Sequence, residues 1–352
     1  METDHRVVVE DSRQLSRIED DAVELVVTSP PYPMIEMWDG LFSELNPAVR
    51  DELDAENGQA AFELMHSELD EVWSEVARVL VDGGIACINV GDATRKLDGS
   101  FRVYQNHSRI INAFEDRGFE PLPEVLWRKP VNSGAKFMGS GMLPPNAYVT
   151  LEHEYILNFR NGKTQRKFEP GSERRYNSAY FWEERNQWFS DVWTDVRGEH
   201  QSLTHDDLRD RSAAYPFEIP YRLVNMYSVY GDTVLDPFWG TGTTSLAAMT
   251  AGRSSIGYEL DEQFTHVFDE RVSDVAELTQ TVIRERLDAH HAFVEEKIES
   301  GTEFNYDAEN YEFPVTTKQE RPIQFYAVES VERTDEGYRA VHEPFEGDAV
   351  RR

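Results

Sequence analysis

Between residues 233 and 244 the chain reads Thr-Val-Leu-Asp-Pro-Phe-Trp-Gly-Thr-Gly-Thr-Thr. The apolar start predicts a short strand over 233–236, and a helical pattern follows from Ser245 to about Thr250. Glycines in such a strand–loop–helix unit let the backbone turn tightly and approach a ligand, as in nucleotide-binding folds. The segment lacks the Gly-Lys-Ser/Thr ending of a phosphate-binding loop and a third glycine at dinucleotide spacing, which disfavours a triphosphate or a dinucleotide. A packed turn without a ligand is the alternative.

Strands and helices alternate on both sides of this loop. Apolar runs predict strands over 23–28, 85–90 and 255–258, and helical spacing predicts helices over 62–80 and from Asp261 to about Ile298. The remaining expected elements are shorter, and they are strands at 124–127 and 155–159 and helices at 107–114 and 215–230. This alternation predicts an α/β fold with a mainly parallel sheet covered on both faces.

A second segment, Thr28-Ser-Pro-Pro-Tyr32, directly follows the strand expected over 23–28. Two successive prolines fix the backbone and leave carbonyl oxygens that no following amide can pair, because proline has no N–H group. Such fixed acceptors, together with the Ser29 hydroxyl, suit an exocyclic amine, and the Tyr32 ring can stack on a base. A proline turn with a packed tyrosine is the alternative.

A third segment, Gly257-Tyr-Glu259, ends the strand after the glycine-rich loop. An acidic residue about 20 residues beyond such a loop can bind ribose hydroxyls in folds of this kind. Glu259 would otherwise be one surface carboxylate among 66 acidic residues, so its interest comes from its spacing.

The chain has 352 residues and is strongly acidic, because 35 Lys and Arg face 66 Asp and Glu, giving a formal net charge of −31. Seven of the basic residues are Lys. An acidic, Lys-poor composition is typical of salt-adapted proteins, whose carboxylates stay hydrated while molar salt screens their repulsion. An ordinary acidic protein is the alternative. The segment 125–175 nevertheless carries a net charge of +5 and holds nine basic residues: Arg128, Lys129, Lys136, Arg160, Lys163, Arg166, Lys167, Arg174 and Arg175.

Composition also excludes several classes of protein. Cys87 is the only cysteine, which excludes an intramolecular disulfide framework and a thiolate zinc cluster, and no metal site is expected. No apolar run approaches the ~20 residues of a membrane span, and residues 1–10 do not look like a signal peptide. We therefore expect a cytoplasmic protein that does not contact membranes.

Together the three segments resemble the β group of DNA amino-methyltransferases, in which the Ser-Pro-Pro-Tyr segment precedes the glycine-rich cofactor loop. The resemblance covers roughly residues 8–267. Three further stretches agree with the family: Glu10-Asp-Ser12, Trp127-Arg-Lys129 and Tyr215-Pro-Phe-Glu-Ile-Pro220. The continuation Met34-Ile-Glu-Met-Trp38 is similar to the CTAG-specific modification methylases of archaea. The resemblance implies a Rossmann-like methyltransferase fold with circularly permuted motif order and an inserted target-recognition region.

The resemblance also implies the cofactor, S-adenosyl-L-methionine, and a role for each motif. Ser29, Pro30, Pro31 and Tyr32 would form the catalytic segment that holds a flipped base and its amino group. Asp11 would contact the adenine, Glu259 the ribose, and Phe217, Asp236, Phe238, Gly240 and Gly242 would complete the cofactor site. The nine basic residues would bind duplex DNA. Cys87 lies in an apolar strand without a preceding proline, so it is expected to be a core residue and not the nucleophile of ring-carbon cytosine methylation.

The residue at position 29 indicates which atom is methylated. In the family that the chain resembles, Ser at this position is common in cytosine-N4 enzymes and Asp is common in adenine-N6 enzymes. We therefore expect cytosine-N4 methylation, with adenine-N6 methylation as the alternative. An inactive DNA-binding protein on the same fold and an RNA methyltransferase are further alternatives. A cognate restriction endonuclease is a further expected partner.

The expected organisation has four parts. Residues 1–129 form the catalytic half of the methyltransferase domain, 130–212 the target-recognition region, 213–299 the cofactor-binding half, and 300–352 an extension to which the sequence assigns no role.

Overall fold

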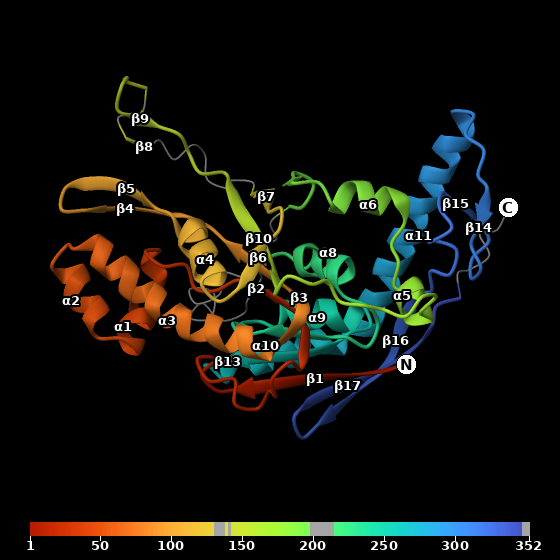
Figure 1. Cartoon of the computed structure of the whole chain (residues 1–352), viewed down its shortest axis with the longest axis horizontal. Helices are drawn as coiled ribbons and strands as arrows, with labels where there is room; N and C mark the ends of the chain where they lie inside the picture. Colours follow the sequence, from red (N-terminus) through yellow and green to blue (C-terminus); the bar gives the residue numbers. More distant parts are fainter. Residues whose placement is uncertain (130–137, 140–141, 198–214, 347–352) are drawn as a thin grey trace.

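The computed structural model describes residues 1–129, 138–139, 142–197 and 215–346, and it is built around one large mixed sheet (Figure 1). Within the described residues this sheet has 11 strands, with β6 (Phe119–Pro121) paired to β10 beside the main row. In spatial order the row is β11 (Val192–Trp193), β7 (Val125–Arg128), β10 (His153–Asn161), β3 (Leu80–Val90), β2 (Val23–Thr28), β12 (Thr233–Asp236), β13 (Ser254–Glu259), β1 (Glu2–Val9), β17 (Gly337–Pro344) and β16 (Tyr326–Thr334).

The five central strands, from β3 to β1, are parallel, as the sequence predicts. Antiparallel pairing begins where β10 joins β3 and where β17 joins β1. The chain therefore adds antiparallel flanks that the alternation of strands and helices does not reveal. Since β2 and β12 lie side by side and lead to opposite halves of the sheet, the loops after them meet at the position where such folds bind ligands.

Strand alternation divides the core between the two faces of the sheet, because successive side chains of a strand point to opposite sides. Val26 and Ile88 belong to one apolar cluster with the helix α3 (Gly58–Val79), while Leu25 and Cys87 belong to another with α8 (Glu218–Tyr227). The helix α9 (Thr243–Thr250) is buried along its whole length on the second side. The prediction that Cys87 is a core residue is confirmed.

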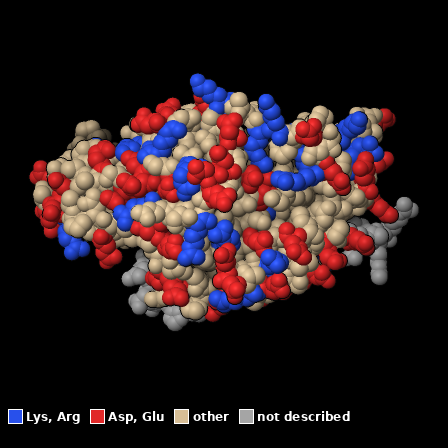
Figure 2. All heavy atoms as spheres, turned by 60° about the horizontal axis from the view of Figure 1, so that its bottom comes forward, with Lys and Arg blue, Asp and Glu red and all other residues tan. Residues whose placement is uncertain are grey.

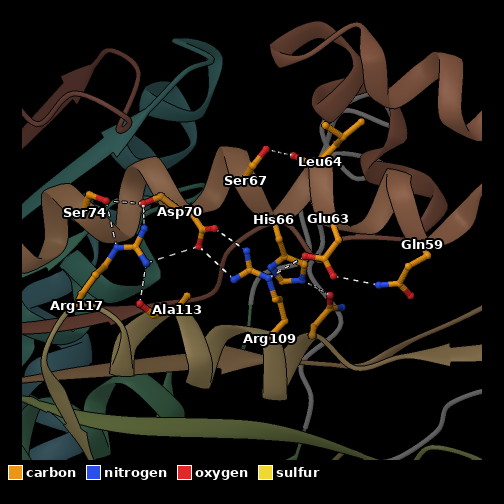
Figure 3. A network of polar contacts seen from close by, with 11 residues as sticks. Gln59, Glu63, Leu64, His66, Ser67, Asp70, Ser74, Arg109, Ala113 and Arg117 are labelled. Carbon is orange, nitrogen blue, oxygen red and sulfur yellow. Dashed lines mark hydrogen bonds and ion pairs between the residues drawn. The ribbon is translucent and has the colours of Figure 1, made fainter.

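The helix α3 confirms the helix expected over 62–80, and polar contacts fix it to α4 (Asn106–Glu115) (Figure 3). Arg109 pairs with both Glu63 and Asp70, and Arg117 donates to the Asp70 carbonyl. Two shorter helices, α1 (Asp39–Leu45) and α2 (Ala48–Asp54), precede α3. This helical layer supports the loop that carries Tyr32.

The region expected to be an insertion is partly built into the main sheet. Its strand β10 pairs with β3 and β7, so residues 153–161 continue the sheet of the catalytic half. The short helices α5 (Glu173–Asn177) and α6 (Trp182–Trp188) follow. Two small antiparallel pairs project from one end of the molecule (Figure 1), and they are β4 (Ala93–Leu97) with β5 (Ser100–Tyr104), and β8 (Met138–Gly139) with β9 (Ala147–Tyr148).

The C-terminal extension also joins the fold. After α10 (Gln263–Ser273) and α11 (Val275–Glu299), a small pair of strands, β14 (Tyr306–Asp307) and β15 (Pro314–Val315), precedes the hairpin β16–β17. The hairpin extends the main sheet at β1, and the Met1 amino group donates to the His342 carbonyl. Residues 326–344 thus cover an edge that β1 would otherwise expose to pairing with other chains.

Charged side chains of both signs are mixed on the face drawn in Figure 2, where Lys and Arg lie among Asp and Glu. Among the helices of the described residues, none has both the length and the apolar character needed to cross a bilayer.

Candidate active site

A cavity of about 630 Å³ lies at the carboxyl ends of the central strands. The Ser29–Tyr32 segment, which follows β2, and the Pro237–Thr241 loop, which follows β12, both contribute to its wall. Tyr32 and Gly240 are more than 200 positions apart in the sequence and line the same cavity. Asp11, Asp236, Phe238 and Glu259 complete the group of predicted residues that the structure brings together there.

Asp236 connects the two segments beneath the cavity. Its buried carboxylate accepts hydrogen bonds from the hydroxyls of Thr28 (2.5 Å) and Thr244 (2.6 Å) and from the amide of Phe238 (3.1 Å). Burial raises the pKa of Asp236 to about 6, and these three donors oppose the rise. The carboxylate therefore holds the end of β2, the glycine-rich loop and α9 in one arrangement.

Glu259 ends β13 and faces the glycine-rich loop. One of its carboxylate oxygens accepts a hydrogen bond from the Gly240 amide (2.8 Å), and the other accepts from the amides of Leu260 (2.9 Å) and Asp261 (3.0 Å). Burial raises the pKa of Glu259, while the backbone donors lower it. These contacts leave the carboxylate at the cavity wall with one lone pair that can accept a ribose hydroxyl.

Asp11 lies at the end of the cavity nearest to β1. Its carboxylate accepts from the Nε (2.9 Å) and a terminal nitrogen (2.7 Å) of Arg13, and Arg13 also pairs with Glu68 of α3 (2.6 Å). Burial raises the pKa of the Asp11 carboxyl, but the bonds from Arg13 outweigh it and the pKa is lowered. An ionised carboxylate here suits an amino-group donor such as adenine.

Two predicted cofactor residues have a different place from the one expected. Phe217 does not line the cavity, and at the start of α8 it stacks on Tyr221, with 5.3 Å between ring centroids. Gly242 has a left-handed φ of 74°, and a Cβ there would come within 2.3 Å of the Phe268 ring. It forms the turn into α9, and it does not line the cavity. Tyr215, which sequence reasoning did not select, does line the cavity.

A cluster of polar side chains lies beneath the catalytic segment. The Tyr32 hydroxyl contacts the Ser29 hydroxyl (3.0 Å), the Glu154 carboxylate (3.0 Å) and the Asn89 amide (2.9 Å). Lys129 donates to the other Glu154 oxygen (2.7 Å). Asn89 comes from β3 and Glu154 from β10, and sequence reasoning missed both. Pairing between the two strands brings them together, and that pairing has no local signature.

A second buried contact fixes the Pro33 end of the same segment. The Asn106 amide donates to the carbonyls of Pro33 (3.1 Å) and Gly91 (3.0 Å), while its oxygen contacts Nε2 of His66 (3.0 Å). Burial lowers the pKa of His66 to about 3, so the ring is neutral and donates from Nε2. The segment is therefore held from both sides before any substrate binds.

The predicted DNA-binding residues are divided between the two ends of the sheet. Arg128 pairs in register with His153 on β10, close to the carboxyl end of β3, and Lys129 follows it. Arg160 lies opposite Ile85 near the other end. Arg166 and Arg174 bind the buried Asp232, which directly precedes β12. Lys136 lies outside the described residues.

Five of the predicted DNA-binding residues lie at the end of the sheet opposite to the cavity. Lys163 and Lys167 flank Arg166, and Arg175 follows Arg174, so all lie with the Asp232 cluster at the amino ends of the strands. Arg166 and Arg175 both lie over the Phe168 ring. The antiparallel course of β10 carries residues 160–175 away from the end of the sheet at which the cavity lies.

The chemistry of the cavity wall fits S-adenosyl-L-methionine. Its volume is within the range of ligand sites, roughly 300–1,000 Å³. The wall combines the carboxylates of Asp11 and Glu259, the apolar ring of Phe238 and the catalytic segment. Hydrogen-bond acceptors for a nucleoside thus adjoin the place where an amine would be held.

Comparison with known proteins agrees with this geometry. The N6_N4_Mtase family model, described as DNA methylase, matches residues 23–270. The chain is 54% identical over 328 residues to the type II methyltransferase M.MthZI of Methanothermobacter thermautotrophicus, covering 93% of this chain and 91% of the relative. It is 53% identical over 281 residues to M.MjaI of Methanocaldococcus jannaschii, covering 77% and 91%.

A solved structure is similar as well. It is TTHA0409 of Thermus thermophilus, a candidate DNA modification methylase crystallised with S-adenosyl-L-methionine. The TM-score is 0.60 at 33% identity, and the match covers 77% of this chain and 94% of that one.

Proposed function

The chain belongs to the N6/N4 DNA methylase family, and from that premise we propose that it methylates the exocyclic N4 of cytosine in duplex DNA. It is an S-adenosyl-L-methionine-dependent DNA amino-methyltransferase. The observation that carries the proposal is the Ser29 hydroxyl at the cavity wall, in the position where cytosine-N4 enzymes of the family commonly have Ser.

Each residue of the catalytic segment has a proposed task. The Ser29 hydroxyl and the Pro30 carbonyl accept hydrogen bonds from the amino group of a flipped base, which draws its lone pair out of conjugation with the ring. When bound, the cofactor supplies an electrophilic methyl carbon. The fixed acceptors face the positive charge that develops on the amine and need no reorganisation. Pro31 keeps the segment rigid, and the Tyr32 ring stacks on the base.

Mapping of the modified base tests this proposal. Duplex DNA is incubated with the protein and the cofactor and then digested to nucleosides. The nucleosides are separated by chromatography and identified by mass spectrometry. We expect N4-methylcytosine, and N6-methyladenine would overturn the choice of base. Sequencing of the methylated positions tests the recognition site, which we propose to be CTAG from Met34–Trp38. It also shows whether a cognate restriction endonuclease would be blocked there.

Glu259→Gln tests the proposed ribose contact. The neutral amide presents one oxygen where the carboxylate presents two, so we expect the affinity for S-adenosyl-L-methionine to fall by about tenfold, the cost of one hydrogen bond of ~1.4 kcal/mol. Titration calorimetry measures the change, and the control is Glu285→Gln, which changes an exposed carboxylate on α11 outside the cavity lining and should leave the affinity unchanged. An unchanged affinity in Glu259→Gln would remove this residue from the cofactor site.

Arg128→Ala tests the proposed DNA surface at the carboxyl end of the sheet. Arg128 is 66% exposed, and we expect its loss to lower duplex affinity and to reduce the slope of log affinity against log salt by about one. Arg175→Ala removes the same charge at the far end and should leave the slope unchanged. Equal effects of the two substitutions would contradict this assignment. Extending the titration to molar KCl also tests the proposed salt adaptation.

A further inference from the structure

Glu154 stands out because it is a buried carboxylate that the proposed chemistry does not use. It is 9% exposed and lies on β10, directly beneath the catalytic segment. One carboxylate oxygen accepts from Lys129 (2.7 Å), and the other accepts from Tyr32 (3.0 Å) and Asn89 (2.8 Å). With these three donors in place, Glu154 acts on the site through Tyr32.

The contacts fix the direction of each hydrogen bond. A carboxylate only accepts, so the single hydroxyl proton of Tyr32 points to Glu154. Burial raises the pKa of Tyr32 well above its ordinary value, and the nearby Glu154 carboxylate raises it further, so that proton is retained. Asn89 must direct its NH₂ group toward this cluster, because its amide oxygen in the same place would be repelled by the Glu154 carboxylate oxygen. Its amide therefore donates to the Tyr32 oxygen.

These bonds also fix the direction in which the Ser29 hydroxyl donates its proton. Because the Tyr32 proton is committed to Glu154, the 3.0 Å contact between the two hydroxyls requires Ser29 to donate to Tyr32. The Asn89 nitrogen also lies 3.5 Å from the Ser29 oxygen, but its two protons point to the closer oxygens of Glu154 and Tyr32. The lone pair that Ser29 turns to the cavity can accept a hydrogen bond, and its proton is unavailable to a substrate.

We propose that Glu154 is a positioning residue that fixes Ser29 as a hydrogen-bond acceptor, so that the site takes a base with an exocyclic amino group and rejects its keto counterpart. The inference rests on the proposed function of Ser29 and adds the origin of its selectivity. An amino group donates to the Ser29 oxygen, whereas a keto oxygen in the same place sets lone pair against lone pair. An unpaired polar contact in a closed site is a strong means of discrimination.

Glu154→Gln tests the inference because it keeps the shape and adds a donor. A glutamine NH₂ can donate to Tyr32, which frees the Tyr32 proton for Ser29 and lets Ser29 donate into the cavity. We expect kcat to fall by about ten- to a hundredfold and cofactor affinity to stay unchanged. We also expect a smaller preference for duplexes with cytosine over duplexes with uracil at the target position, measured by competition binding. If mapping identifies adenine, hypoxanthine replaces uracil.

The matched control is Glu184→Gln, which changes another buried, ion-paired carboxylate that lies on α6 and binds Arg286. It should lower stability and leave kcat and the base preference as in the wild type. In a Tyr32→Phe background the effect of Glu154→Gln should largely disappear, because the Tyr32 hydroxyl that links Glu154 to Ser29 by hydrogen bonds is absent.

The outcomes separate the inference from the proposed function. A wild-type protein that methylates no amino group overturns the function itself. A wild-type protein that methylates, with an unchanged base preference in Glu154→Gln or an equal effect of this substitution in both backgrounds, overturns only the role of Glu154.

Discussion

Ser29→Ala is expected to lower kcat by about two to three orders of magnitude, which is the typical cost of removing one preorganised hydrogen-bond partner of a transition state. The substituted residue has no oxygen for the amino group, while the Pro30 carbonyl stays in place. The cofactor affinity should change little, because Ser29 lies at the base end of the cavity, where it contacts Tyr32 and Asn89. Single-turnover methylation and titration calorimetry measure the two quantities separately.

The control for this substitution is Ser108→Ala. The Ser108 hydroxyl is exposed on α4 and donates to the Gln105 carbonyl, so its removal should leave both quantities unchanged. Loss of cofactor binding in Ser29→Ala would place this residue at the cofactor and contradict the proposed role. An undiminished kcat would show that the Pro30 carbonyl and the Tyr32 ring suffice to hold the base.

Those parts of the site that depend on short segments could be predicted from the sequence. The strands β2 and β12 are followed directly by Ser29-Pro-Pro31 and by Pro237. Neighbouring parallel strands place the loops after them at the same edge of the sheet. The positions of Asp236 and Glu259 follow from the same rule. The pattern of β-branched and apolar residues sufficed for these strands because both of their faces are buried.

The residues that were missed depend on strand pairing between distant segments. Glu154 and Asn89 meet because β10 runs antiparallel to β3 in one register, and a shift by one residue would turn Glu154 to the opposite face. The same pairing divides the basic segment between the two ends of the sheet. Net charge along the sequence does not reveal that β10 runs from one end of the sheet, beside Arg128, to the other end, where Arg160 lies.

The C-terminal hairpin shows a similar limit. Residues 337–342 of β17 alternate between partly buried and buried positions, but nothing local tells which edge the hairpin joins. The edge is set by β1, whose other side is occupied by β13. Assigning a role to this extension therefore required the tertiary structure.

The largest expected effect on stability belongs to Asp232→Ala. Asp232 is fully buried and accepts hydrogen bonds from Arg166 (2.6 and 2.9 Å), from Arg174 and from the Val229 amide (2.9 Å). Removing the carboxylate leaves a partly buried guanidinium and an amide without their acceptor. We expect the free energy of unfolding to fall by about 3–5 kcal/mol, as when one partner of a buried ion pair is removed. Urea unfolding followed by tryptophan fluorescence measures the loss.

Two comparisons decide whether burial causes that loss. Asp20→Ala removes a carboxylate that pairs with Arg78 but is 73% exposed, so its cost should be below about 1 kcal/mol. Raising the salt concentration should erase the small effect and leave most of the large one, because screening acts mainly on exposed charges. Equal costs for the two substitutions would mean that Asp232 is hydrated. Residues 166–175 would then be free to bind DNA, as their charge alone suggested.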